Sequence, residues 1–187
     1  MKTITAFLII VIIIFTCLNS ACSQPDLQQP STEVIGNAPD FIQSRTDFEE
    51  SKFCQLYGCV HSGNHQFSDG RDYNMYVVEN YPNRYDDILI ELIGKEDDLI
   101  EFGVVLDGMP PTRPNLSSED FQFLYDFISS ISNQNDLDPT VQEYLRQNIE
   151  IDVSQICSME PLDYGSMRLW AGKIITPSIL ISKICPK

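Results

Sequence analysis

The sequence predicts an α+β domain in which an antiparallel sheet of about five strands carries helices on one face. The apolar patterns along the chain follow the order α-β-β-β-α-α-β-β, whereas a doubly wound parallel sheet would alternate strand and helix. Turn-forming residues separate the first three strands, as expected for consecutive antiparallel hairpins. No repeat with a period of about 20 to 50 residues is present, which argues against solenoids and propellers.

The first expected element is a helix over residues 47–57. Thr46 and Glu49 have the spacing of a capping box, in which each side chain satisfies a free backbone amide of the other residue. Gly58 supplies the left-handed residue that commonly ends a helix. A polar loop is expected to follow over residues 61–71.

Three runs rich in β-branched, aromatic and other apolar residues are expected to form strands. They cover residues 73–78, 88–93 and 99–106. Three prolines within residues 108–114 end the third strand, because proline has no N–H to donate to a ladder. Two further runs, 166–175 and 178–184, complete the sheet near the C-terminus.

Two helices are expected between these groups of strands, packed as a hairpin. Ser117 and Asp120 form a second capping box, and Asp138, followed by a proline, begins the next helix. Apolar residues with helical spacing predict a buried face on each helix. These residues are Phe121, Leu124, Tyr125, Ile128 and Ile131 on the first, widened by Phe123 and Phe127, and Val141, Tyr144, Leu145 and Ile149 on the second.

The N-terminus has the features of an export signal, expected over residues 1–21. Lys2 supplies a positive start, and residues 6–15 form an unbroken apolar run. That run is too short for a membrane span, which needs about 20 apolar residues. Residues 22–40 are rich in proline and polar residues and have no apolar period, so a flexible tether is expected there. Residues 41–187 are expected to form a single folded domain.

Two cleavage sites compete at the end of the signal. Residues 18–22 (LNSAC) resemble the lipobox of bacterial lipoproteins, with Asn19 where that motif favours leucine. The resemblance implies that Cys22 becomes lipid-modified and is the new N-terminus, so the protein would be a membrane-anchored lipoprotein of the cell envelope. In the alternative, residues 21–23 (ACS) are an ordinary small-x-small site, and a secreted or periplasmic protein begins at Gln24.

Four cysteines remain beyond the signal: Cys54, Cys59, Cys157 and Cys185. An even number of cysteines in an exported protein predicts two disulfides, and three connectivities are open. Bridges that join the early pair to the late pair are favoured, because each would close a loop of about 100 residues. In the chain-entropy model such a loop contributes about 4 to 5 kcal/mol.

Composition and motifs exclude several functions. The chain has 27 acidic and 12 basic residues, a formal net charge of −15, and no cluster of lysine and arginine, so no nucleic-acid partner is expected. The serine-hydrolase elbow G-x-S-x-G and glycine-rich phosphate loops are absent from the sequence. No cofactor is therefore expected.

The polar groups that resemble known sites have simpler explanations. His61 and His65 follow the first two cysteines and are weak candidates for zinc, but the spacing is unfamiliar and the thiols are expected to be oxidised. The same oxidation removes Cys59 as a nucleophile beside His61. Residues 133–138 resemble a calcium loop without its glycine and bidentate glutamate, and helix capping by Asp138 explains them. No metal site and no catalytic residue is therefore expected.

Some aromatic residues are candidates for a partner surface. Tyr81 and Tyr85 lie near turns, and Trp170 lies in a strand together with Arg168 and Lys173. Tyrosine, tryptophan and arginine dominate the energetics of protein interfaces. Packing of these rings over the open face of the sheet is nevertheless the favoured interpretation, because aromatic residues dominate cores.

The expected function is therefore binding. The sequence indicates an exported, lipid-anchored, non-catalytic domain that binds another envelope or extracellular component, with the membrane and a protein as its partners. The alternative is a small exported hydrolase whose acid and base are carboxylates on the sheet. Glu91, Glu101 and Asp107 are the candidates for these roles, and the first two interrupt apolar strands.

Overall fold

The computed structural model describes residues 39–81, 87–107 and 116–183. The chain divides into two units, 1–34 and 35–187, and every described residue belongs to the second. The expected signal peptide with Cys22, most of the expected tether, Tyr85, the proline-rich segment 108–114 and Cys185 lie outside the described residues.

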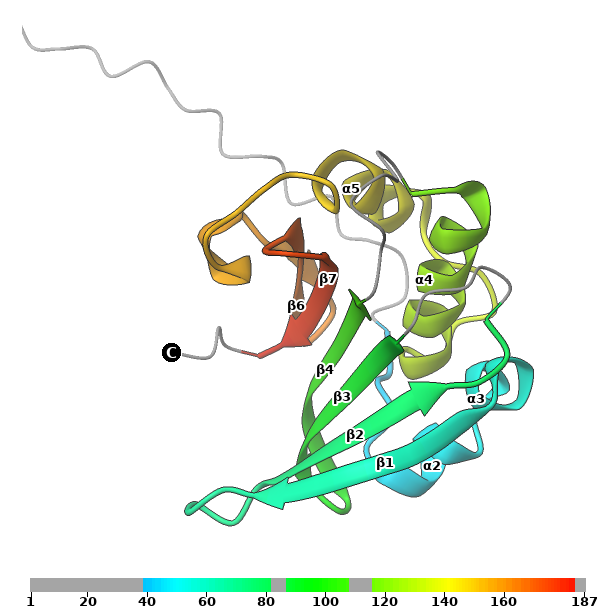
Figure 1. The fold of residues 1–187 in the computed structure, drawn as a ribbon, viewed down its shortest axis with the longest axis vertical. Coiled ribbons are helices and arrows are strands. Elements are labelled where there is room, and N and C mark those ends of the chain that lie inside the picture. The colour runs from blue at the N-terminus through cyan, green and yellow to red at the C-terminus, as the bar shows by residue number, and fades with distance from the viewer. Residues whose placement is uncertain (1–38, 82–86, 108–115, 184–187) are drawn as a thin grey trace, which may run out of the picture. The chain divides into compact units, whose positions relative to one another are not determined.

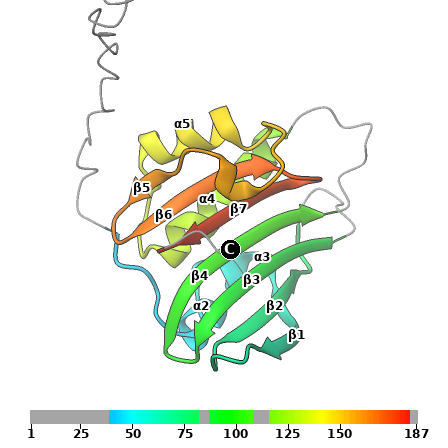
Figure 2. The ribbon, with the colours of Figure 1, turned by 90° about the vertical axis from the view of Figure 1, so that its left-hand side faces the viewer.

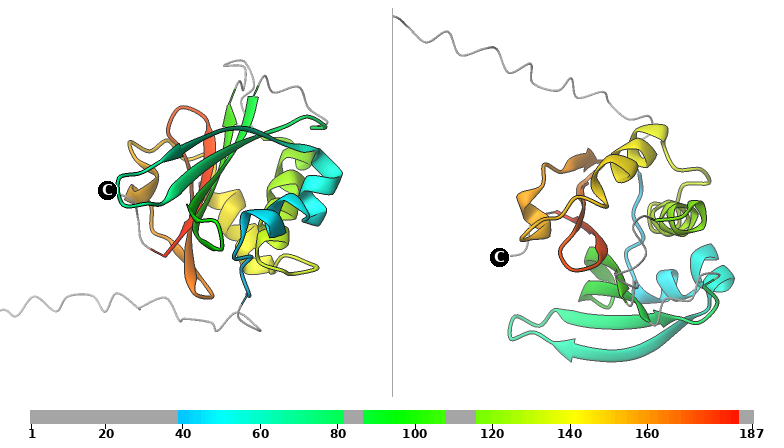
Figure 3. Two further views of the ribbon diagram at one scale, coloured as in Figure 1. Left: turned by 90° about the horizontal axis from the view of Figure 1, so that it is seen from below. Right: turned by 45° about the horizontal axis from the view of Figure 1, so that its top comes forward.

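The described chain folds into one antiparallel seven-stranded sheet with helices on one side of it, which confirms the α+β class (Figure 1). The strand order is β1-β2-β3-β4-β7-β6-β5, so two meanders meet where β4 pairs with β7. The expectation of about five strands is therefore two strands too low. The two strands that were not expected, the polar β1 and the short β5, form the edges of the sheet. Figure 2 looks onto the strands, with α2, α3 and α4 behind them, and Figure 3 shows the sheet curving around α4.

The strands are β1 (Cys59–Gln66), β2 (Asp72–Val78), β3 (Asp87–Lys95), β4 (Asp98–Asp107), β5 (Leu162–Tyr164), β6 (Met167–Lys173) and β7 (Pro177–Ser182). The helices are α2 (Arg45–Glu49), α3 (Lys52–Tyr57), α4 (Ser118–Ile131) and α5 (Pro139–Asn148), with a 3-10 turn η1 (Ile156–Ser158) before β5. Five of these strands were expected from the sequence, with shifts of one or two residues at their ends.

The first helical region is two short helices, so the expected single helix over 47–57 is wrong. The side chain of Ser44, rather than that of Thr46, caps α2, and the side chain of Ser51 caps α3. The side chains of Ser44 and Ser51, seven residues apart, each accept a backbone amide, and the second cap divides the segment. Gly58 ends α3 with φ of 71°, as expected.

Most of the strand β1 lies inside the segment that was expected to be a polar loop, and β5 was not expected at all. Apart from Cys59 and Gly63, every residue of β1 is exposed, so the strand has no apolar alternation that the sequence could reveal. The strand is defined by its antiparallel hydrogen-bond ladder with β2, and this ladder has a bulge between His61 and Gly63.

The two later helices begin as expected. Ser117 and Asp120 form a complete capping box at α4, and Asp138 caps α5 with proline in the first turn. Of the expected buried faces, Phe121 and Tyr144 are only half-buried and the rest are buried. Both helices therefore bury the apolar side that their spacing indicates.

An aromatic cluster fills the space between the helices and the sheet. The ring of Phe53 lies 5.1 Å from that of Phe123 and 5.4 Å from that of Phe127, and the ring of Phe48 lies 5.1 Å from that of Tyr76. All five side chains are at most 1% exposed. This cluster joins α2 and α3 to α4 and β2 within the core.

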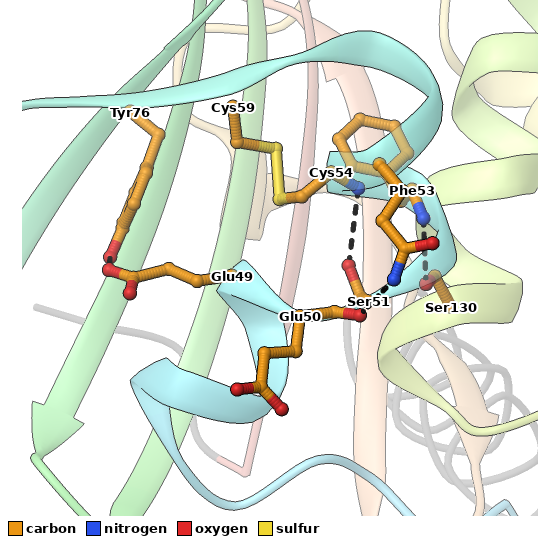
Figure 4. Close-up of a disulfide and its surroundings, with 9 residues drawn as sticks. Glu49, Glu50, Ser51, Phe53, Cys54, Cys59, Tyr76 and Ser130 are labelled. Carbon is orange, nitrogen blue, oxygen red and sulfur yellow. Dashed lines mark hydrogen bonds between the residues drawn. A yellow bond between two sulfur atoms is a disulfide. The ribbon is translucent and has the colours of Figure 1, made fainter.

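A disulfide joins Cys54 of α3 to Cys59 of β1 (Figure 4). The expectation that early cysteines pair with late ones is therefore wrong. The reason is geometric, since the turn at Gly58 brings the two Cα atoms within 4.8 Å of each other. For a sequence separation of 5, the chain-entropy model gives about 2 kcal/mol, roughly half of the value for a loop of about 100 residues. Cys157 is also disulfide-bonded, and the other half of that bond lies outside the described residues.

Within the described ranges, none of the helices combines the length and apolar character that crossing a membrane requires.

Candidate binding surface on the open face of the sheet

The sheet has one face toward α2–α5 and one face away from them, which we call the open face. Over β6 and β7 this face is covered by η1 and the residues before it. Ile90, Leu92 and Phe102 are fully buried and belong to the core beneath the helices. Because neighbouring residues of a strand point to opposite faces, Glu91 of β3 and Glu101 of β4 lie on the open face. The two strands pair so that each carboxylate residue is diagonal to the other. The sequence identified both glutamates singly, and the register brings them together.

Asp107, the third acidic candidate, does not join this pair. It ends β4 opposite Asp87, six residues beyond Glu101. At the rise of a β-strand, this spacing corresponds to about 20 Å. The three expected carboxylates therefore do not form one site.

A hydrogen bond holds the side chain of Glu91 in place, and burial affects the protonation of Glu101. The hydroxyl of Tyr73 on β2 donates to Oε1 of Glu91 at 2.5 Å. Glu101 is only 8% exposed, and this burial raises its pKa. The charge of Glu91 also raises the pKa of Glu101, whereas a hydrogen bond with Ser182 and the charge of Arg71 lower it. Burial, followed by the bond to Glu91, raises the pKa of Tyr73.

Aromatic and cationic groups adjoin the carboxylates at the turn between β1 and β2. The ring of Phe67 lies 5.6 Å from that of His65 and 6.3 Å from that of Tyr73. The guanidinium of Arg71 lies 5.1 Å from the centre of the Phe67 ring and forms an ion pair with Asp69. We call Phe67, Arg71, Tyr73, Glu91 and Glu101 the open-face cluster.

The sequence did not reveal the aromatic part of this cluster. The available signal was the alternation of His65, Phe67 and Tyr73 around a turn that begins with Phe67 and contains Gly70. That signal was hidden because β1 was expected to be a loop.

The two histidines point to opposite faces of the sheet. His61 pairs with Tyr76, whose side chain is in the core, and His65 pairs with Tyr73 on the open face. The bulge between them reverses the alternation of side chains along β1, so the two imidazoles lie on opposite faces of the sheet and cannot bind the same metal ion. The described residues contain no group of three or more His, Cys, Asp or Glu side chains that could hold one. In the segment 133–138, Asp138 caps α5.

The aromatic residues that were candidates for a partner surface are packed where the structure describes them. Trp170 is 3% exposed, and Tyr81 packs against Phe123 with 4.7 Å between ring centres. Arg168 and Lys173 form ion pairs with the aspartates of neighbouring segments. Both described rings therefore pack, as favoured: Trp170 packs on the open face, as expected, whereas Tyr81 packs on the helix side of the sheet instead.

A polar cleft of about 520 Å³ lies where residues 40–52 meet the end of α4 and the loop that follows. Hydrogen bonds join some polar groups of its lining. The amide of Asn133 donates to the carbonyl of Asp40 at 3.0 Å, and the ammonium of Lys52 donates to Asn135 at 3.4 Å. The cleft does not include Glu91 or Glu101, so it and the open-face cluster are separate features.

The variant Glu101→Gln is expected to be more stable than the wild type at pH 8 by about 0.5–2 kcal/mol, the usual range for a stabilising substitution. The folded pKa of Glu101 is raised above the ordinary value of 4.5. The wild type therefore loses stability as pH rises from about 4.5 through the folded pKa, because the folded state binds the proton more tightly than the unfolded state. Below that window the two proteins should differ little.

Urea unfolding at pH 4 and pH 8 measures this difference. Glu143→Gln, at an exposed position of α5, is the matched control and should show no such dependence. A Glu101→Gln effect of equal size at both pH values would contradict the prediction.

Comparison of the chain with protein-family models, curated proteins and solved structures gives no match. The geometry of the chain itself therefore carries the functional argument.

Proposed function

We propose that the protein is an exported, lipid-anchored, non-catalytic domain that binds another envelope or extracellular component through the open-face cluster. The observation that carries the proposal is the cluster itself. Phe67, Tyr73 and Arg71 are half-buried and adjoin the glutamate pair, on the part of the open face over β1 to β4 that the described helices leave uncovered. Aromatic residues and arginine at such positions are the usual anchors of protein interfaces.

Export is supported by the apolar run of residues 6–15 and by the disulfide between Cys54 and Cys59, because disulfides persist in oxidising compartments. Intact mass of the protein extracted from membranes tests the anchor. Lipid on an N-terminal Cys22 is expected. A protein that begins at Gln24 without lipid would replace the anchor with simple secretion.

Photo-crosslinking in cells that produce the protein tests binding. A photoreactive phenylalanine analogue at Phe67 should give one dominant crosslinked product, and the same analogue at Glu143 on α5 should not. Adding Arg71→Ala should reduce the product at least about tenfold, which corresponds to about 1.4 kcal/mol. Circular dichroism verifies that each variant is folded. Equal crosslinking from both positions, or no product, would reject the proposed surface.

The pairing of Glu91 and Glu101 favours one second candidate, a small hydrolase. A carboxyl group with a raised pKa beside a second carboxylate is a common arrangement for a general acid and its partner base. Turnover of chromogenic esters, glycosides or peptides that both Glu91→Gln and Glu101→Gln abolish would favour the enzyme over the binding domain. Absence of turnover across these substrates would reject it.

A further inference from the structure

The two edges of the sheet differ. At one edge, β5 has only three residues, and the far end of β6, at Lys173, pairs with a segment that contains Asp152. The N–H of Lys173 donates to the carbonyl of Ile151 and the N–H of Val153 to that of Lys173, both at 2.9 Å. At the other edge, β1 has eight residues and pairs with β2 alone. No described segment lies along its outer side in Figures 1 and 3.

The composition of β1 leaves this edge open. In a chain with 27 acidic and 12 basic residues, β1 contains neither a charged residue nor a proline. Charged residues, especially lysine, and proline are the devices that usually protect an edge from pairing with another chain. The one protective device present is the bulge between His61 and Gly63. Beyond the bulge, residues 63–66 continue the regular ladder with β2.

We propose that residues 63–66 receive an extended, basic segment of the partner, which adds a strand to the sheet. The proposal rests on the proposed function, because the added strand belongs to the partner bound at the open-face cluster. An edge strand presents the N–H and C=O groups of every second residue to its outer side. An extended backbone laid along that edge can form hydrogen bonds with these groups in turn.

Charge and position define the segment further. The net charge of −15 attracts a basic segment and repels a second copy of this chain. His65 pairs directly with Tyr73, so an added strand along residues 63–66 would place alternate side chains beside the open-face cluster. One partner can therefore contact both features.

Backbone chemistry offers a direct test on the full chain. The probe is a short synthetic peptide of alternating lysine and valine. It is compared with the same peptide N-methylated at alternate residues and with a glutamate-valine peptide. The lysine-valine peptide should slow amide hydrogen exchange at the outward-facing positions within residues 63–66 by at least about tenfold. The N-methylated peptide keeps the charge but lacks donors, so it should fail, as should the acidic peptide.

Two proline variants supply a matched pair, because the N–H groups of successive residues in a strand point to opposite edges. Whichever of the two amides, that of residue 64 or that of residue 65, exchanges faster in the free protein is the one that points outward. The proline variant at that position, Asn64→Pro or His65→Pro, should remain folded and lose the protection that the peptide gives. Equal protection by the N-methylated peptide, or protection outside β1, would overturn the proposal. Self-association of the protein with the same protection in the absence of peptide would also overturn it, because the occupant would then be a second copy.

The proline variant also separates this proposal from the proposed function. If crosslinking from Phe67 persists undiminished in the folded proline variant, the added strand is wrong and the open-face partner stands. If the wild type gives no crosslink from Phe67 while the lysine-valine peptide protects residues 63–66, the proposed partner surface fails and the edge remains a strand acceptor.

Discussion

Phe127→Ala is expected to lower the free energy of unfolding by about 3–5 kcal/mol, the usual cost of removing a buried phenylalanine side chain. Phe127 has no exposed area, and its ring contacts those of Phe48 and Phe53. Truncation removes transfer free energy and leaves a cavity among three helices, which cannot close without moving α2 or α3. Domains of this size are stable by about 5–15 kcal/mol, so the variant should lose a large part of its stability.

Urea unfolding followed by circular dichroism measures this loss. Phe121→Ala is the matched control, because it removes the same side chain from the same helix at a half-buried position. Its cost should be clearly smaller. Equal losses at the two positions would show that the aromatic cluster does not carry the stability attributed to it.

Asp120→Ala is expected to lower the free energy of unfolding by about 2–4 kcal/mol. The carboxylate is fully buried and accepts the N–H of Ser117 at 2.7 Å, which completes the cap of α4. Its other oxygen accepts the hydroxyl of Tyr81. Loss of a cap costs about 0.5–2 kcal/mol, and removing a buried acceptor costs about 1–3 kcal/mol.

A double-mutant cycle separates these two contributions. Tyr81→Phe removes the hydroxyl and leaves the cap in place, so Asp120→Ala and Tyr81→Phe together should cost less than the sum of their separate effects. A coupling of about 0.5–3 kcal/mol is the range for residues in direct contact. If the free-energy changes of the two substitutions were strictly additive, the Tyr81 hydrogen bond would contribute nothing to stability. The loss in Asp120→Ala alone would then measure the contribution of the cap.

The elements that the sequence predicted are those whose signals are local. Capping residues and apolar spacing identify α4 and α5, and apolar runs identify the central strands. The strand β1 has neither signal, because an edge strand exposed on both faces is defined by its hydrogen bonds to β2. The division of the first helix at Ser51 was equally hidden, since Ser44, Thr46 and Ser51 are all competent caps and only packing selects two of them.

The candidate site was predictable in its parts and not in its assembly. Glu91 and Glu101 stand out in the sequence as acids within apolar strands. Their proximity depends on the register between β3 and β4, which shifts at a bulge between Ile93 and Gly94. A shift of one residue would place Glu91 on the opposite face, and no composition rule fixes such a shift. The contribution of Tyr73 depends on one more register, that of β2 with β3.

The pairing of β4 with β7 has a consequence for how the chain acquires its structure. Glu101 lies opposite Ser182, so the middle of the sheet joins residues that are synthesised far apart in time. A chain that emerges from its N-terminus first must wait for its last strand, and until then β4 has an unpaired side. Contacts so distant in sequence slow folding toward the millisecond-to-second range. The final strand therefore controls when the fold is completed, and losing it would expose the centre of the sheet rather than its margin.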